Sequence, residues 1–296
     1  MGTMKGRRQI LTVILSFMGL VSPSLPGHAP DSLQRLREIH QHLMDPTQFF
    51  SISKTLAEPD ELETTIPPGD NEARGELNYL RGFVLYRAQK PRESLPPSLE
   101  ALRIDTITPF LPDDERTSLI YSIASQAEEI GDWSTAIKFY EEAMPLFDAS
   151  AEYSEEQRLA LRERQAYCLH EAGRYPEALA LNKQALEAGE KLFGPDSEKL
   201  LVVVTNISQN AYVLGDPKTT QSFLERVLAT ATKHDQHSHI DNALFLLGVL
   251  AFEQDRFEEA EAYMKRRLSL AEASSDSNRI KSAREDLEIL YEKMSR

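Results

Sequence analysis

Residues 173–178, Gly-Arg-Tyr-Pro-Glu-Ala, recur in altered form at three other places in the chain. Each copy has a turn-forming residue first and an aromatic residue or proline third, and three of the four have alanine sixth. The copies begin at residues 131, 173, 215 and 255, so the spacings are 42, 42 and 40 residues. Self-similarity at a fixed period indicates a repeat architecture. The copies read GDWSTA at 131–136, GRYPEA at 173–178, GDPKTT at 215–220 and DRFEEA at 255–260.

Each copy lies between two stretches with helical periodicity. Ile120, Ile123 and Ala124 precede the first copy at the spacing of a buried helix face. Gly131 then supplies a residue that adopts positive φ and closes the helix, and Asp255 takes that position in the last copy. Because neither helix of such a pair can bury its apolar stripe alone, neighbouring pairs must stack on one another.

The period and the linkers resemble those of the tetratricopeptide repeat, and more narrowly its longer kinesin-light-chain type. Residues 190–196, EKLFGPD, are similar to the linker of that type, with Asn206 in the following helix, and residues 254–261 are a second close match. The resemblance covers residues 117–272. It implies an all-α fold: an α-solenoid of stacked helix–turn–helix units wound into a right-handed superhelix.

The regions outside the repeats also favour helices. Gly82 and Gln89 lie 42 residues before Ala124 and Gly131, which predicts a degenerate repeat. Prolines at 91, 96 and 97 should degrade its second helix, and the polar residues 58–72 should form a loop. The expected organisation is a signal peptide at 1–29, an N-terminal helical region with the degenerate repeat at 30–116, four repeats at 117–272, and a capping helix at 273–296.

The N-terminus is typical of a secretory signal peptide. Lys5, Arg7 and Arg8 precede a mostly apolar run at 10–21, and residues 27–29, Gly-His-Ala, have the form of a cleavage site. The two arginines loosely resemble a twin-arginine export motif. We therefore expect a secreted or periplasmic protein; the alternatives are an uncleaved membrane anchor and a mitochondrial transit segment.

Composition excludes several classes of protein. A mean hydropathy of −0.42 excludes a protein with many membrane spans, and cleavage of the signal would leave no stable membrane insertion. A net charge of −14 disfavours nucleic-acid binding, which needs a basic face. The single cysteine, Cys168, excludes an intramolecular disulfide.

The sequence carries little that points to catalysis. Residues 170–174 begin like the zinc motif H-E-x-x-H, but Arg174 stands where the second histidine belongs. Cys168 falls inside a repeat helix, where a buried structural role is expected. Three histidines, His234, His237 and His239, are weak candidates for a metal site. The simpler interpretation is that they lie in a solvent-exposed linker. We expect no cofactor and no enzymatic activity.

The resemblance implies that the first helices of the repeats line a concave peptide-binding groove. A lysine clamp for a C-terminal carboxylate is not expected, because Tyr121, Glu163, Thr205 and Phe245 hold its first position. The expected partner is a protein or peptide with basic and apolar residues. The alternatives are a regulatory subunit of a separate enzyme or assembly, and a metal or small-ligand sensor. The candidate groove residues are Tyr121, Glu128, Glu163, Tyr167, His170, Tyr212, Phe245 and Phe252.

Overall fold

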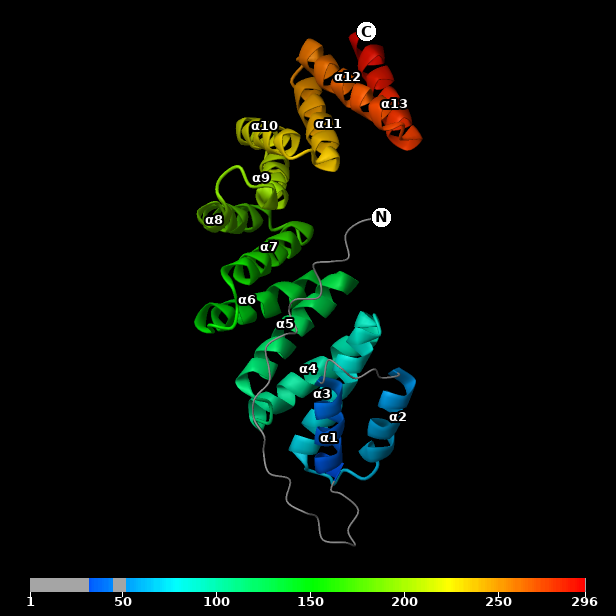
Figure 1. Cartoon of the computed structure of the whole chain (residues 1–296), viewed down its shortest axis with the longest axis vertical. Coiled ribbons are helices and arrows are strands. Elements are labelled where there is room, and N and C mark those ends of the chain that lie inside the picture. Colours follow the sequence, from blue (N-terminus) through cyan, green and yellow to red (C-terminus); the bar gives the residue numbers. More distant parts are fainter. Residues whose placement is uncertain (1–31, 45–51, 296) are drawn as a thin grey trace. The chain divides into compact units, whose positions relative to one another are not determined.

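The computed structural model describes residues 32–44 and 52–295, and this part of the chain contains helices and no β-strand (Figure 1). The signal-peptide interpretation of residues 1–29 lies outside the described residues. The chain divides into two compact units, Met1–Ile130 and Gly131–Arg296. No helix in the described part is both long and apolar enough to span a bilayer.

The first unit is built around the helix α3. Leu36 of α1 and Leu77, Leu80 and Val84 of α3 are almost completely buried in one apolar cluster. α2 packs on α3 as well, and α4 lies between α3 and α5 in chain order. The helices are α1 (Ser32–Met44), α2 (Ile52–Glu63), α3 (Asn71–Arg87), α4 (Pro91–Ile107) and α5 (Asp113–Ile130).

The degenerate repeat is a complete helical hairpin, formed by α3 and α4. Gln89 adopts φ 59° between the two helices, as its alignment with Gly131 predicts. Gly82 lets the helices approach closely, because a Cβ there would lie 2.3 Å from Oγ of Ser98. The expectation that the prolines degrade α4 is wrong: Pro91 occupies the first turn, and the helix runs through Pro96 and Pro97 to Ile107. Packing on α3 outweighs the loss of two backbone hydrogen bonds near the N-terminal end.

The loop expected at residues 58–72 is also shorter than its composition suggests. α2 continues to Glu63, with Pro59 buried inside it. Arg81 of α3 binds the carboxylates of Asp60 and Glu63, which fixes this end of α2. Tertiary contacts therefore override the low helix propensity of the segment.

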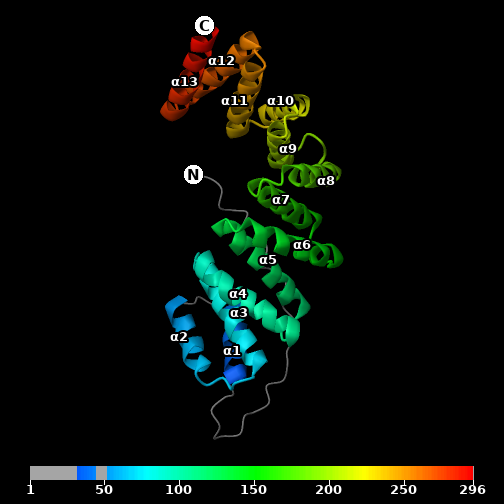
Figure 2. The same cartoon turned by 180° about the vertical axis from the view of Figure 1, so that it is seen from behind.

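The second unit is a stack of consecutive helices in which each packs on the next along the chain (Figures 1 and 2). Its main core cluster joins α7 to α11, and a second cluster joins α11, α12 and α13. The fold is thus the α-solenoid of helical hairpins expected from the repeats. The helices are α6 (Trp133–Ala149), α7 (Glu155–Glu171), α8 (Tyr175–Phe193), the 3₁₀ turn η2 (Glu198–Leu200), α9 (Leu201–Val213), α10 (Pro217–Lys233), α11 (His237–Glu253), α12 (Phe257–Ser274) and α13 (Ser277–Met294).

The repeated turn residues behave as their chemistry predicts. Gly173, Gly215 and Asp255 all have φ between 56° and 75° at the ends of α7, α9 and α11. After Gly215, Asp216 caps α10 by accepting a hydrogen bond from the backbone N–H of Thr219. The turns therefore let the second helix of each repeat fold back onto the first, as α8 does on α7, α10 on α9 and α12 on α11.

Arg267 holds the last helix of the unit in place. Its guanidinium group is almost completely buried, and it pairs with Asp241 of α11 and Asp286 of α13. Leu287 and Leu290 of α13 complete the apolar cluster below it. α13 thus covers the apolar face that the last repeat would otherwise expose.

Candidate functional site

The eight candidate groove residues lie on first helices, but in both units. Tyr121 and Glu128 are half-buried on α5 of the first unit. The other six lie on α7, α9 and α11 of the second unit. The site is therefore built here from the second unit alone.

Phe245 and Phe252 pack against their own neighbours on α12. The guanidinium carbon of Arg267 lies 5.0 Å from the Phe245 ring centroid, which is a cation–π contact. Phe252 makes an edge-to-face contact with Phe257, with 5.9 Å between centroids. Both side chains are half-buried, so they add less exposed apolar surface to the candidate groove than the sequence analysis expects.

Tyr167 and Tyr212 differ from the two phenylalanines because they are exposed, at 42% and 40% respectively. The Tyr167 ring stands edge-on to Trp133, with 6.0 Å between centroids. The Tyr212 hydroxyl donates a 2.5 Å hydrogen bond to Glu253 of α11. This bond raises the pKa of Tyr212, because ionisation would place two negative charges together. Both rings are thus held in position yet open to solvent, as aromatic binding residues are.

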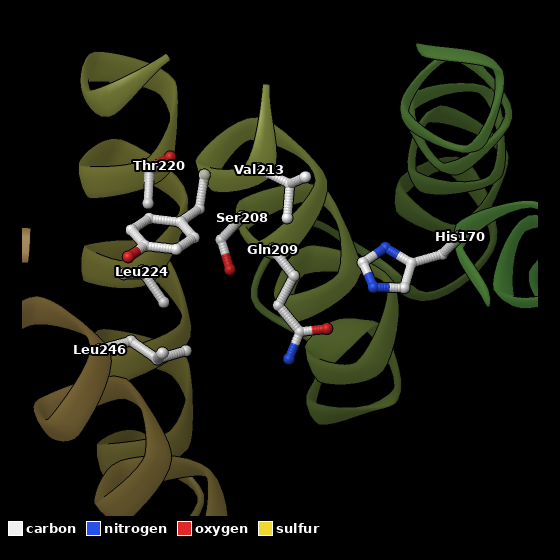
Figure 3. A pocket seen from close by; sticks show the side chains of 8 residues that line it. His170, Ser208, Gln209, Val213, Thr220, Leu224 and Leu246 are labelled. Carbon is white, nitrogen blue, oxygen red and sulfur yellow. The ribbon is translucent and has the colours of Figure 1, made fainter. Parts of the chain in front are cut away.

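A pocket of about 250 Å³ lies beside Tyr212 (Figure 3). Its walls come from four helices, because the stacking of repeats places α7, α9, α10 and α11 around it. It brings together His170 and Tyr212, which the sequence predicts as groove residues. The substitution of Thr220 for the usual alanine is the sequence signal for unusual packing here. The lining residues are His170, Ser208, Gln209, Tyr212, Val213, Thr220, Leu224 and Leu246.

His170 is oriented by two contacts. Its Nδ1 lies 2.9 Å from Oδ1 of Asn210, and its ring stands edge-on to Tyr175. Asn210 is fully buried, and its Nδ2 donates to the carbonyl of Asn206. In Figure 3 the imidazole reaches from α7 toward Gln209 and Val213 of α9. The ring therefore presents its other edge to the pocket.

Glu163 carries the strongest electrostatic signal among the candidate residues. Burial raises the pKa of its carboxyl group to about 7. The group lies on α7, one turn before Tyr167. Its negative charge is therefore controlled by pH in the neutral range.

The remaining candidates are not gathered into a site. His237 and His239 lie in the first turn of α11, while His234 Nε2 lies 2.9 Å from the carbonyl oxygen of Asp196. Within residues 32–44 and 52–295, no group of three His, Cys, Asp or Glu side chains is arranged to hold a metal ion. Cys168 is buried in α7.

The sequence model of the tetratricopeptide repeat family matches residues 157–233, which include the EKLFGPD linker and the pocket residues of α7, α9 and α10. These residues are accordingly tetratricopeptide repeats, and the resemblance is confirmed. Comparison with curated protein sequences finds no significant match.

Several solved structures share this fold. BtubC (BKLC) from P. vanneervenii is 19% identical with a TM-score of 0.54, over 83% of this chain and 93% of its own. The apo form of RapI is 16% identical with a TM-score of 0.61, over 85% of this chain and 67% of its own. The apo form of the quorum sensor NprR from B. thuringiensis is 17% identical with a TM-score of 0.52, over the same shares. At these identities the likeness establishes the fold alone.

Proposed function

We propose that the second unit is a non-catalytic scaffold that binds a segment of another protein across α7, α9 and α11. The observation that carries this proposal is the pair of exposed tyrosines, Tyr167 and Tyr212, with a 250 Å³ pocket beside Tyr212. Exposed aromatic side chains held in fixed positions next to a pocket are typical of binding anchors. The quorum sensor NprR, solved in its apo form, has the same fold, which supports ligand binding as a use of this fold.

The charges around the pocket favour a basic partner. Glu253 holds the Tyr212 hydroxyl, and Glu163 and Glu171 lie on α7 together with Tyr167. The whole chain carries a net charge of −14. A negative surface attracts basic segments and accelerates their encounter, so the partner segment should combine basic with apolar residues.

We also propose that the protein is exported, because residues 1–29 combine a basic start, an apolar run and small residues. N-terminal sequencing of the native protein should find a start between Leu25 and Asp31. An intact Met1 or Gly2 on a cytosolic protein would contradict this.

Loss of both tyrosines tests the binding proposal. The partner is first identified by affinity purification, and its bound segment by cross-linking to α7 and α9. The double variant Tyr167→Ala with Tyr212→Ala should then lower the affinity for that segment by about 30-fold or more, which is about 2 kcal/mol. Binding should also weaken as salt rises.

Val202→Thr is the matched control. Val202 is 51% exposed on α9 but does not line the pocket, so its replacement should leave affinity unchanged. Circular dichroism should show full helicity in all variants. Undiminished affinity in the double variant would contradict binding at this surface.

A further inference from the structure

One face of α1 packs into the apolar cluster of the first unit. Leu36, His40 and Leu43 are buried, at helical spacings of four and three residues. The two leucines join the cluster built on α3, and α1 packs mainly on α3 rather than on α2 (Figure 1). An amphipathic helix that lays residues i, i+4 and i+7 on an apolar surface docks as a helical ligand does.

The part of α3 that α1 covers corresponds to the candidate groove of the repeats. Tyr79 lies 42 residues before Tyr121, which is one of the candidate groove residues. The His40 ring packs on the Tyr79 ring with 4.8 Å between centroids, and Phe83, one turn further along α3, packs against the same apolar cluster. In the first unit, α1 therefore occupies the face of a first helix on which the repeats are expected to bind a partner.

The charges of α1 and of the surface beneath it are complementary. Three basic side chains of α1 each face at least one carboxylate from another helix. Exposed pairs of this kind stabilise weakly, and a helix of 13 residues is marginal by itself, so α1 is a helix that another can replace. The pairs are Arg35 with Glu58 of α2, Arg37 with Glu72 of α3, and His40 with Glu76 of α3 and Glu115 of α5.

The fit of α1 to this surface is incomplete at His40. Nε2 of His40 and Oε2 of Glu115 are both buried and 3.4 Å apart, and neither makes a hydrogen bond within the described part of the chain. Leaving buried polar atoms unpaired costs free energy. An arginine at this position has five donors, enough for both Glu76 and Glu115, and a guanidinium also stacks well on an aromatic ring such as that of Tyr79.

From this arrangement we infer that Glu76, Tyr79 and Phe83 of α3, with Glu115 of α5, form a second docking surface. Its partner is an amphipathic helix that carries an arginine at the position of His40, and α1 shields the surface until such a helix displaces it. This inference goes beyond the proposed function, which concerns the second unit.

Two synthetic peptides test the surface on the full chain. One has the sequence of residues 32–44, and the matched peptide differs only by His40→Arg. Both must compete with α1, whose tether gives it an effective concentration on the order of millimolar. We expect the arginine peptide to bind at least about 5-fold more tightly, the scale of one added hydrogen bond to a charged group.

A reversed charge tests whether a peptide docks in the place of α1. Glu72→Arg in the full chain should repel Arg37 of the first peptide and attract a peptide with Arg37→Glu. The preference between these two peptides should therefore invert, by about 3- to 10-fold in each direction. Glu93→Arg is the control, because Glu93 also lies in the first turn of a helix of this unit but pairs with Lys90 of α4.

Hydrogen exchange of the parent chain locates the docking. The arginine peptide should speed exchange in residues 32–44 of the chain while α3 stays protected. Tyr167→Ala with Tyr212→Ala should leave peptide binding unchanged, so failure of the proposed function is distinguishable from failure of this inference. No binding of the arginine peptide, binding that leaves α1 protected, or an unchanged preference in Glu72→Arg would each overturn the inference.

Discussion

His40 in the first unit and His170 in the second show two different uses of the same side chain. His40 is buried, with Nδ1 2.5 Å from Glu76 and Nε2 3.4 Å from Glu115. His170 is half-buried, with one nitrogen fixed by a neutral amide and the other facing a pocket. His40 therefore links α1 to α3 and α5. His170 is held in one orientation, and its second nitrogen remains accessible to a ligand. A buried histidine with a carboxylate beside each nitrogen stabilises the fold, and a histidine with one nitrogen facing a pocket can bind a ligand.

The largest expected effect is the loss of stability when His40 is removed. His40→Ala leaves Glu76, which is only 3% exposed, and Glu115 without their common partner. Breaking a buried pair in this way costs about 3 kcal/mol. Hydrogen exchange of α3 peptides in the full chain should show this loss in the first unit, while His170→Ala changes stability by under about 1 kcal/mol. Equal effects of the two variants would remove the distinction between the histidines.

Two glycines at the same repeat position offer a second contrast. A Cβ on Gly82 would lie 2.3 Å from Oγ and 3.1 Å from the backbone nitrogen of Ser98, whereas one on Gly248 would meet Cε of Met264 at 2.9 Å. The backbone of Ser98 cannot shift to accommodate a methyl group, whereas the flexible end of the Met264 side chain can. Gly82→Ala should cost about 2 kcal/mol of unfolding free energy, and Gly248→Ala should be nearly neutral. Chemical denaturation checks both, and comparable losses would contradict this reading of the hairpins.

The stability of the first unit should also depend on pH through His40. Burial alone lowers the pKa of His40, but the hydrogen bond and charge of Glu76 and the charge of Glu115 outweigh it, so the pKa is raised. Tyr79 of α3 and Asp114 of α5 are the other titratable groups at this cluster; burial chiefly raises the pKa of Tyr79 and of Glu115.

A raised histidine pKa stabilises the fold fully below the ordinary value of about 6.5 and loses that contribution as pH rises through the folded value. We expect the unfolding free energy of this unit to fall above about pH 6.5, with a slope of at most about 1.4 kcal/mol per pH unit. His40→Leu should flatten that slope. A parent protein whose stability rises over this range would contradict the sign.

The smallest effect concerns binding and Glu163. Because its pKa is about 7, the carboxyl group gains its charge only as pH rises from 6 to 8. A basic segment should bind about threefold more tightly at pH 8 than at pH 6 through this group, the scale of a partly exposed ion pair. Isothermal titration of the parent and of Glu163→Gln isolates the contribution, since pH effects from other groups remain in both. An unchanged pH dependence in the variant would exclude Glu163 from the binding surface.

The sequence predicts the hairpins well because turn chemistry and apolar periodicity are local. Gly173 and Asp255 signal their turns directly, and Gln89, which carries no such signal, is placed by its 42-residue distance from Gly131. The prolines of α4 mislead because the packing that holds them in a helix comes from α3.

The site is less predictable because its walls come from different repeats. The groove row includes His170 and Tyr212, but their partners Asn210 and Glu253 lie 40 and 41 residues further along the chain. No local pattern distinguishes an open Tyr212 from Phe245, which Arg267 covers from a neighbouring helix. The packing of neighbouring repeats determines which aromatic side chains remain exposed to solvent.

The most direct test of binding at α9 is site-specific photo-cross-linking. A photoreactive phenylalanine analogue replaces Tyr212 in one variant and Val202 in another, and both are exposed to the purified partner. We predict that position 212 cross-links to one short segment with basic and apolar residues, while position 202 gives little product. Equal cross-linking from the two positions, or none from position 212 while the partner stays bound, would contradict the account.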